Sequence, residues 1–581
     1  MDTPLAPTRL SSARRLRPDA VAAGCYLLLA FALTARLWRH PTGLMVAGNP
    51  NDTDLLTWWL SWTADALVGG DFTLTVQAMN APSGVSAMWN PALLLPGIVL
   101  APVTLIAGAQ ASYNVLVLLG FAGSAFTAFL LLRRHTDAAM WPAVAGGALY
   151  GFSPAMVHVS VGHLQLLLAP LVPLLVSASL DLLHRRVTVQ RGGVRLGLLA
   201  AAQLFTGEEL LYDTVLVVAL LVIVLALSRP QLARQRIGFV TRGLAVATVI
   251  GGLVAGYPVW VQLHGPLAQQ GSAFVADFYK ADLSGFVTPS RMMVLHSAES
   301  AAAADRYSGG VPEYLAYLGW PLLAVIAVAV VAGWRDLQLR VSALLTVLLA
   351  TLSLGATVVY QGNPTSIPGP WRLLQHLPLA ESVLATRFGL FAPMAAGAVV
   401  AIVLTRVHSR WSPLAAAAVA AVLLAPLLPR PLQVEAVAIT PESTMRALAT
   451  VPTGDTVLVV PFPTATQTAP MRWQVDAGFG YRMPGGYFTG PGPDGHAYIG
   501  GDAPRATEAL LTEVLDTQVE FGITAEDRAA ATADLAYWGV DTVVLGPSQD
   551  SAVLERTLTA LFGSPTSVYG GTVIWRDVGS G

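Results

Sequence analysis

The sequence has 581 residues, of which 54% are hydrophobic and only 12% are charged. Soluble domains carry about 25% charged residues, so this composition excludes an ordinary soluble protein and indicates an integral membrane protein. The formal net charge of −2 is uninformative because it averages an arginine-rich side against an acidic side, and the single Cys25 excludes a disulfide within the chain.

Apolar runs of roughly 17 to 25 residues, the length that a membrane-spanning helix needs, recur along most of the chain. Ten such runs and a shorter eleventh near residues 194 to 206 predict a mainly α fold, a polytopic transmembrane bundle of about eleven spans. The proline-containing segment 92 to 107 is predicted to be a re-entrant or interfacial helix that does not cross fully. The ten runs lie near residues 21–38, 112–132, 141–157, 164–183, 209–228, 238–263, 314–333, 341–358, 389–405 and 412–428.

The arginines orient this bundle, because cytoplasmic loops carry an excess of Lys and Arg. They gather in alternate loops, which predicts a cytoplasmic N-terminus. The first loop, residues 39–111, and everything after residue 428 are then extracytoplasmic. The arginines of the alternate loops are Arg133, Arg134, Arg185, Arg186, Arg191, Arg195, Arg229, Arg234, Arg236, Arg335, Arg340, Arg406 and Arg410.

After residue 428 the composition becomes that of a soluble domain. We therefore divide the chain into a transmembrane module, residues 1–428, and an extracytoplasmic domain, residues 429–581. Strand-like and helix-like stretches alternate in the second part, which predicts a small α/β domain. The predicted strands are 456–460, 541–545 and 573–576, and the predicted helices are 505–519, 525–538 and 551–562.

An acidic cluster, residues 51–54, lies just beyond the first span and holds Asp52 and Asp54. The next segment, residues 55–67, has a helical apolar pattern, and its tryptophans suit a membrane interface. A helix that starts after Asp54 would place both acids at its positive N-terminal end. Either acid alone could merely cap that helix, but a cap explains one acid more easily than two. Both are therefore candidate catalytic residues.

Other polar residues are predicted at the same membrane face. His163 and Gln165 flank a turn between two spans, where a lone histidine is more often structural than a ligand. Glu208 and Glu209 begin a later span. Acids at membrane depth are costly and tend to mark function, so these two are stronger candidates, although they also suit the first turn of a helix.

The loop of residues 359–388 places Arg372, His376 and Arg387 on the side opposite to the positive-inside preference. Some partner must hold these cations there. Arginine forks match phosphate oxygens bidentately, which favours an anionic ligand. A salt bridge to Glu381, or contact with lipid headgroups, is the alternative.

Taken together, several features resemble the glycosyltransferase superfamily C, or GT-C. These are the apolar first helix, the acidic cluster at residues 51–54, the tryptophan-bearing loop helix, the Asn90-Pro91 segment, the many spans and the outward C-terminal domain. The stretch Pro368 to Phe388 also resembles the loop before a late helix in bacterial relatives. The resemblance implies a membrane glycosyltransferase that takes a sugar from a polyprenyl phosphate donor. It further implies a first-loop acid, Asp52 or Asp54, as the base that activates the acceptor.

The expected partners are the lipid-linked donor, membrane lipid and a glycan, lipid or protein acceptor, with no nucleic acid. Acidic oxygens also suit a divalent metal, magnesium or manganese, through Asp52, Asp54 and Glu209. The candidate substrate-binding residues are His163, Gln165, Glu208, Glu209, Arg372, His376 and Arg387.

Two other classes of function also fit a polytopic protein. A lipid or glycolipid transporter or flippase would place charges near the bilayer midplane and show repeated halves; here the polar residues gather at one face and no repeat is visible. A non-catalytic cell-envelope assembly protein would use the C-terminal domain as a binding module. One observation separates the enzyme from the rest: Asp52 or Asp54, Glu208 or Glu209, and Arg387 should share one extracytoplasmic cavity.

Overall fold

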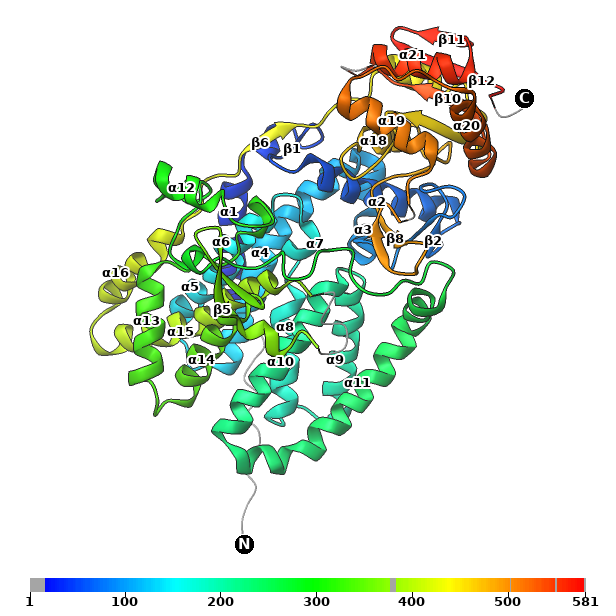
Figure 1. The fold of residues 1–581 in the computed structure, drawn as a ribbon. Helices are drawn as coiled ribbons and strands as arrows, with labels where there is room; N and C mark the ends of the chain where they lie inside the picture. The colour runs from blue at the N-terminus through cyan, green and yellow to red at the C-terminus, as the bar shows by residue number, and fades with distance from the viewer. Residues whose placement is uncertain (1–15, 377–382, 502, 549–550, 579–581) are drawn as a thin grey trace.

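The structure, a computed structural model, describes residues 16–376, 383–501, 503–548 and 551–578. It is a helical bundle with the C-terminal domain packed on one end (Figure 1). Within this part of the chain, five helices are long and apolar enough to cross a membrane, and five shorter apolar helices accompany them. The protein is therefore a multi-pass membrane protein, as the sequence predicts. The long helices are α4 (Ala109–His135), α8 (Leu171–Leu183) with the short α7 (Leu164–Leu167) before it, α10 (Glu208–Ser228), α11 (Pro230–His264) and α15 (Phe388–Arg410).

Each predicted apolar run contains a helix, but not every run is one straight span. The run 141 to 157 is divided into α5 (Met140–Gly151) and α6 (Pro154–Val159), because Ser153 caps the second helix. The proline-containing segment forms α3 (Leu94–Ala107), whose 14 residues rise about 21 Å, less than a hydrocarbon core of roughly 30 Å. The other bundle helices are α1 (Leu16–Thr34), α9 (Val189–Leu204), α13 (Trp320–Ala332), α14 (Leu337–Leu352) and α16 (Pro413–Leu424).

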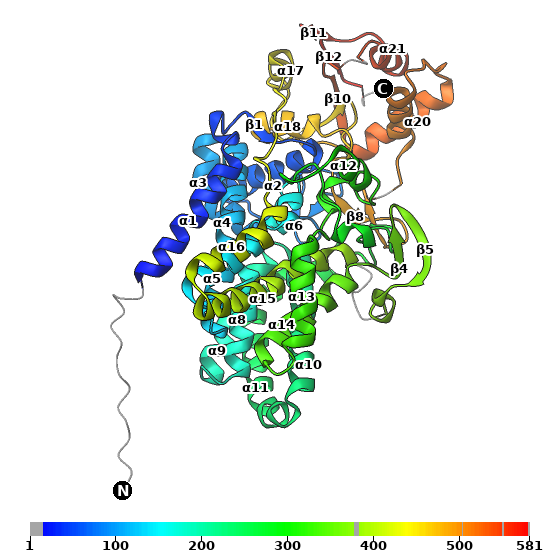
Figure 2. The same cartoon turned by 90° about the vertical axis from the view of Figure 1, so that its left-hand side faces the viewer.

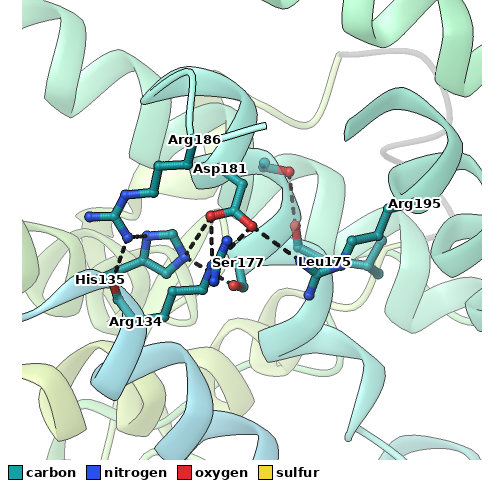
Figure 3. A network of polar contacts seen from close by, with 8 residues as sticks. Arg134, His135, Leu175, Ser177, Asp181, Arg186 and Arg195 are labelled. Carbon is teal, nitrogen blue, oxygen red and sulfur yellow. Dashed lines mark hydrogen bonds and ion pairs between the residues drawn. The ribbon is translucent and has the colours of Figure 1, made fainter. Parts of the chain in front are cut away.

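Charged residues at the end of the bundle away from the C-terminal domain form a network around Asp181 (Figures 1 and 3). The Asp181 carboxylate lies 2.7 Å from Arg134 Nε, 3.1 Å from Arg195 Nη1 and 3.7 Å from His135 Nε2. Nearby, Arg236 of α11 donates a hydrogen bond of 2.9 Å to the last carbonyl of α8. Loops that the sequence predicts to be cytoplasmic therefore adjoin at one end of the bundle.

The C-terminal domain is α/β, as predicted. Its four-stranded sheet has the order β11-β12-β10-β7, in which β7 and β10 are parallel and β12 is antiparallel to β10. The predicted strands and helices all appear within two residues of their expected bounds; the sequence did not predict α17, α18 or four strands of three residues each. The elements are α17 (Glu442–Leu448), β7 (Thr456–Val460), α18 (Ala469–Asp476), α19 (Ala506–Thr517), α20 (Ala525–Trp538), β10 (Val540–Leu545), α21 (Ser551–Phe562), β11 (Ser567–Tyr569) and β12 (Thr572–Arg576).

The first loop and the C-terminal domain share one hydrophobic core. Helix α2 (Pro50–Gly69) lies beside α18 (Figure 2), and its Trp58 and Trp59 are fully buried. The Trp58 indole donates a hydrogen bond of 2.8 Å to Gln474 Oε1 and packs edge-on against Phe479. The prediction that these tryptophans face the membrane interface is therefore wrong, because the C-terminal domain covers them.

Short strands complete the contacts around the bundle. In particular, the loop after α11 is joined to the C-terminal domain at Gln270, whose N–H donates to Gly495 O at 2.9 Å and whose carbonyl accepts from Ala497 N–H at 2.8 Å. The loop after α11 and the C-terminal domain thus lie together at the same end of the bundle. The remaining elements are the pair β1 (Leu44–Val46) and β6 (Val434–Ala436), the hairpins β2 (Thr75–Val76) with β3 (Val85–Ser86), β4 (Thr357–Tyr360) with β5 (Asn363–Pro368) and β8 (Thr489–Pro491) with β9 (Ala497–Ile499), and α12 (Ala298–Ala304).

Candidate active site

A cavity of about 450 Å³ lies between the bundle and the C-terminal domain. Helices α2 and α10 begin at this cavity and present acids from their first turns, where the helix dipole favours carboxylates. The loop after α11 and the segment 487–499 of the C-terminal domain also line it. Most of the predicted site residues meet here: Asp52, His163, Gln165, Glu208, Glu209 and Arg387.

Asp52 is the acid of the first loop that faces the cavity. It is not the cap of α2, because Asn49 takes that place and accepts a hydrogen bond from the Asp52 N–H. Asp52 Oδ2 lies 2.7 Å from Asn49 Nδ2 and 3.1 Å from His163 Nε2, and Oδ1 accepts a hydrogen bond of 2.7 Å from the Tyr487 hydroxyl. Burial works against ionisation, but His163, Tyr487 and Asn49 outweigh it and lower the Asp52 pKa. The carboxylate is thus ionised at neutral pH and able to accept a proton.

Asp54 faces a different direction. Its side chain is buried against α18, where it forms an ion pair with Arg472 and accepts a hydrogen bond of 2.5 Å from the Thr468 hydroxyl. Burial raises the Asp54 pKa to about 6 although Arg472 and Thr468 act to lower it. Asp54 does not line the cavity. The two neighbouring acids therefore have opposite surroundings and opposite pKa shifts.

Arg387 is buried and held by two carboxylates. Its Nε lies 3.0 Å from Glu209 Oε1, and its Nη1 lies 2.8 Å from Glu313 Oε1. These partners explain how a cation is held on this side of the bundle; the suggested partner Glu381 lies outside the described residues. In the described part of the chain, no hydrogen bond from Arg387 Nη2 is found.

Glu313 is a site residue that the sequence reasoning missed. It is 4% exposed and lines the cavity. Its Oε1 lies 3.3 Å from His163 Nδ1, so His163 bridges Glu313 and Asp52. The sequence held a signal for this residue, because Glu313 directly precedes a predicted span, as Glu208 does. A continuous polar chain results, which runs through Tyr487, Asp52, His163, Glu313, Arg387 and Glu209.

Two predicted substrate-binding residues are not part of this site. Arg372 and His376 are exposed and do not line the cavity. Their loop approaches the bundle through Trp371, which packs against Phe388. Of the aromatic residues in the C-terminal loop, Phe488 is buried in the core, Tyr487 reaches the cavity and Tyr498 is exposed.

The three acids suggested as metal ligands have separate partners. Asp52 contacts His163, Asp54 pairs with Arg472, and Glu209 pairs with Arg387. Among the described residues, no group of three or more His, Cys, Asp or Glu side chains is arranged to hold a metal ion. The three acids therefore do not gather into one cluster in this structure.

No protein-family model matches the chain, and no curated protein sequence matches it. Solved structures do. The arabinofuranosyltransferase AftD from Mycobacteria matches over 99% of this chain and 42% of its own length, with a TM-score of 0.50 and 15% sequence identity. The chain has a GT-C fold. Because the chain spans less than half of that transferase, the likeness concerns the fold.

Two further GT-C structures cover more of their own length. ArnT from Cupriavidus metallidurans, bound to undecaprenyl phosphate, matches over 97% of this chain and 98% of its own, with a TM-score of 0.39 and 13% identity. The Archaeoglobus fulgidus oligosaccharyltransferase, tethered to an acceptor peptide, matches over 92% of this chain and 70% of its own, with a TM-score of 0.46 and 12% identity.

Proposed function

We propose that the protein is a membrane glycosyltransferase that moves a sugar from a polyprenyl phosphate donor to an extracytoplasmic glycan, lipid or protein acceptor. One observation carries the proposal. Asp52, Glu208, Glu209 and Arg387 come from three distant segments of the sequence, yet they line one cavity in a GT-C fold. The fold alone would not require this convergence, since function resides in sites rather than in folds.

Asp52 acts as the general base in this proposal. The acceptor hydroxyl oxygen attacks the anomeric carbon of the donor and forms the new glycosidic bond, while the bond from that carbon to the phosphate oxygen breaks. Asp52 takes the hydroxyl proton, and the polyprenyl phosphate leaves with the electron pair. The Asp52 carboxylate lines the cavity and is ionised before the reaction begins, as a general base must be.

Arg387 stabilises the leaving phosphate. Glu209 and Glu313 fix its Nε and Nη1, so the guanidinium plane is held at the cavity wall. The remaining nitrogen, Nη2, is the donor available to a phosphate oxygen that gains charge in the transition state. Held in this way, the fork requires no reorganisation when the donor binds.

Uncharged polar atoms of the cavity bind the sugar. The side-chain carbonyl oxygens of Gln165 and Gln269 are buried, line the cavity and have no hydrogen-bond donor in the described part of the chain. Glu208, which accepts a hydrogen bond of 2.7 Å from Gln262, lies beside them in the wall. Sugar hydroxyls would satisfy these acceptors, and a buried acceptor without a donor costs about 1–3 kcal/mol.

The test is a transfer assay with purified protein in lipid vesicles and undecaprenyl phosphate carrying arabinofuranose, mannose, glucose or galactose. We expect Asp52→Asn to lower transfer by about 10²- to 10⁴-fold, the usual contribution of a general base, with normal membrane expression. Asp54→Asn, two residues away on the same helix, is the matched control and should retain most activity. Full activity of Asp52→Asn would refute the role of the base. Efficient use of a nucleotide sugar alone would refute the proposal that the donor is a polyprenyl phosphate sugar.

A further inference from the structure

We propose that the C-terminal domain contributes a positioning residue, Tyr487, which orients the Asp52 carboxylate and selects Oδ1 as the oxygen that accepts the proton. The inference rests on the proposed function, because it assigns a role to the partner of the proposed base. Tyr487 lies 435 residues after Asp52 in the chain, and its hydroxyl donates a hydrogen bond of 2.7 Å to Asp52 Oδ1.

The backbone on both sides of Tyr487 is anchored to the first loop. Before it, Asn80 N–H donates to Gly485 O at 2.9 Å. After it, the Asn90 side chain accepts from Thr489 N–H at 2.8 Å and donates to Thr489 O at 3.0 Å. Gly486 has a positive φ of 136°, and a Cβ there would lie 2.3 Å from Met79 Cγ. The loop can therefore pass Met79 only with glycine at this position.

The C-terminal domain also holds α2 from its other side. Thr468 donates to Asn51 Oδ1 at 3.1 Å and to Asp54, and Arg472 pairs with Asp54. One turn later, Trp58 donates to Gln474. Two segments of the domain thus contact the first turns of α2. The segment with Thr468 and Arg472 binds Asp54, and the segment with Tyr487 binds Asp52. The position of the Asp52 carboxylate in the cavity therefore depends on the domain.

The lone pairs of Asp52 indicate which oxygen takes the proton. A carboxylate has about four acceptor directions, two on each oxygen. Oδ2 already faces two nitrogens, Asn49 Nδ2 at 2.7 Å and His163 Nε2 at 3.1 Å. Oδ1 receives only the Tyr487 hydroxyl in the described part of the chain. One direction on Oδ1 is left for the acceptor hydroxyl, and the hydrogen bond from Tyr487 fixes where it points.

Tyr487→Phe tests this role, because it removes the hydroxyl and retains the ring. We expect kcat to fall about tenfold with little change in KM, because the released carboxylate no longer points its open direction at the acceptor hydroxyl. The acidic limb of the pH profile should move to higher pH, because Tyr487 stabilises the ionised carboxylate. Three other groups interact electrostatically with Asp52, namely His163, Tyr279 and Tyr113. The variant keeps all three, so a shift of the pH profile is due to the lost Tyr487 hydroxyl.

A double-mutant cycle separates positioning from folding. In an Asp52→Glu background the longer side chain displaces the carboxylate from Tyr487, so adding Tyr487→Phe should lower kcat less than twofold. Tyr498→Phe is the matched control: it removes a tyrosine hydrogen bond of 3.0 Å to Asp494 in the same loop, outside the cavity lining. We expect it to keep the kcat and the pH profile of the unmodified protein.

Three outcomes would overturn the proposal: an unchanged kcat and pH profile in Tyr487→Phe, an equal loss of activity at every pH together with a lower melting temperature, or the same tenfold loss in the Asp52→Glu background. None of these bears on the base itself. If Asp52→Asn loses transfer while Tyr487→Phe behaves as the unmodified protein, only the positioning role fails. If Asp52→Asn is fully active, the proposed function fails as well.

Discussion

Two buried charge networks lie at opposite ends of the bundle, and they are built differently. Around Asp181, one carboxylate meets Arg134, Arg195 and His135 (Figure 3), and its side chain is 1% exposed. Four carboxylates line the cavity. Arg387 pairs with Glu209 and Glu313, His163 lies between Asp52 and Glu313, and Glu208 accepts a hydrogen bond from the neutral Gln262. The Asp52 side chain there is 17% exposed. The central carboxylate of the first network is closed to solvent, whereas the second network lines a cavity.

The two networks show that buried charge has a different role around Asp181 than in the cavity. Both Asp181 oxygens have cationic partners, so the network joins the ends of α4 and α8 to α9 and leaves nothing for a ligand. At the cavity, the amide oxygens of Gln165 and Gln269 are buried without a donor in the described part of the chain. A satisfied polar network makes a structure rigid, whereas unsatisfied groups beside a cavity are suited to a ligand.

Among the variants that compare the two networks, those of Arg387 have the largest expected effect, because Arg387 both holds two carboxylates and belongs to the proposed donor site. Arg387→Lys keeps the charge but cannot hold Glu209, Glu313 and a phosphate oxygen together, so donor affinity should fall about tenfold and the melting temperature should also fall. Arg387→Ala removes the cation that pairs with the buried Glu313 and the partly exposed Glu209. Breaking a buried ion pair typically costs about 3–5 kcal/mol of stability, and donor binding should weaken further.

The control for Arg387 lies in the other network. Arg134→Lys also replaces a fork that binds a buried carboxylate, but it is remote from the cavity. We expect it to lower the melting temperature and leave donor affinity unchanged. Affinity is measured by titration of undecaprenyl phosphate on the folded protein. Normal affinity in both Arg387 variants would remove Arg387 from the donor site.

Asp181→Asn should lower stability and leave catalysis intact. The substitution leaves Arg134 and Arg195 without an anionic partner. Because both arginines are partly exposed and water can solvate them, the cost should be smaller than the roughly 3–5 kcal/mol of a fully buried pair. We expect a lower melting temperature but the unmodified transfer rate per folded molecule. A fall in kcat without a loss of stability would show that the two networks do not differ in role.

Much of the fold and part of the site could be predicted from the sequence. Glu208 and Glu209 stand out because carboxylates at membrane depth are costly, and Arg387 stands out because it breaks the positive-inside pattern. Both predictions lead to the cavity. The strands and helices of the C-terminal domain were predicted because apolar runs alternate with clear turn and cap residues there.

What the sequence could not resolve depends on contacts between distant segments. The helix α2 begins at Pro50, earlier than expected, because Asn49 caps it. On a helix, residues two apart differ in direction by about 200°, so Asp52 and Asp54 face different neighbours. The prediction placed both acids before the helix and could not separate them. The bond from Tyr487 to Asp52 has no local signal, since it joins residues 435 positions apart.

Asp54 gives the smallest expected effect. Its pKa shift is opposite in sign to that of Asp52. Burial raises the Asp54 pKa from 3.8 to about 6, so the folded protein binds more protons than the unfolded chain between these values. Stability from this group is therefore present at low pH and lost as the pH rises through 6. From pH 5 to pH 7 the loss is about 1 kcal/mol.

Asp54→Asn removes this titration while the amide can still accept hydrogen bonds from Thr468 and Arg472. The unmodified protein loses the stability due to Asp54 between pH 5 and pH 7, and the variant does not. The change in melting temperature between these pH values should therefore differ between the two proteins. Asp52→Asn provides the contrast: the Asp52 pKa is lowered, so its contribution is present at neutral pH and lost only in acid. Calorimetry of both variants at the two pH values checks this.

If Asp54→Asn keeps the pH dependence of the unmodified protein, Asp54 does not titrate in this range. The proposed division between Asp52 as the catalytic acid and Asp54 as the acid that anchors α2 then loses its electrostatic basis.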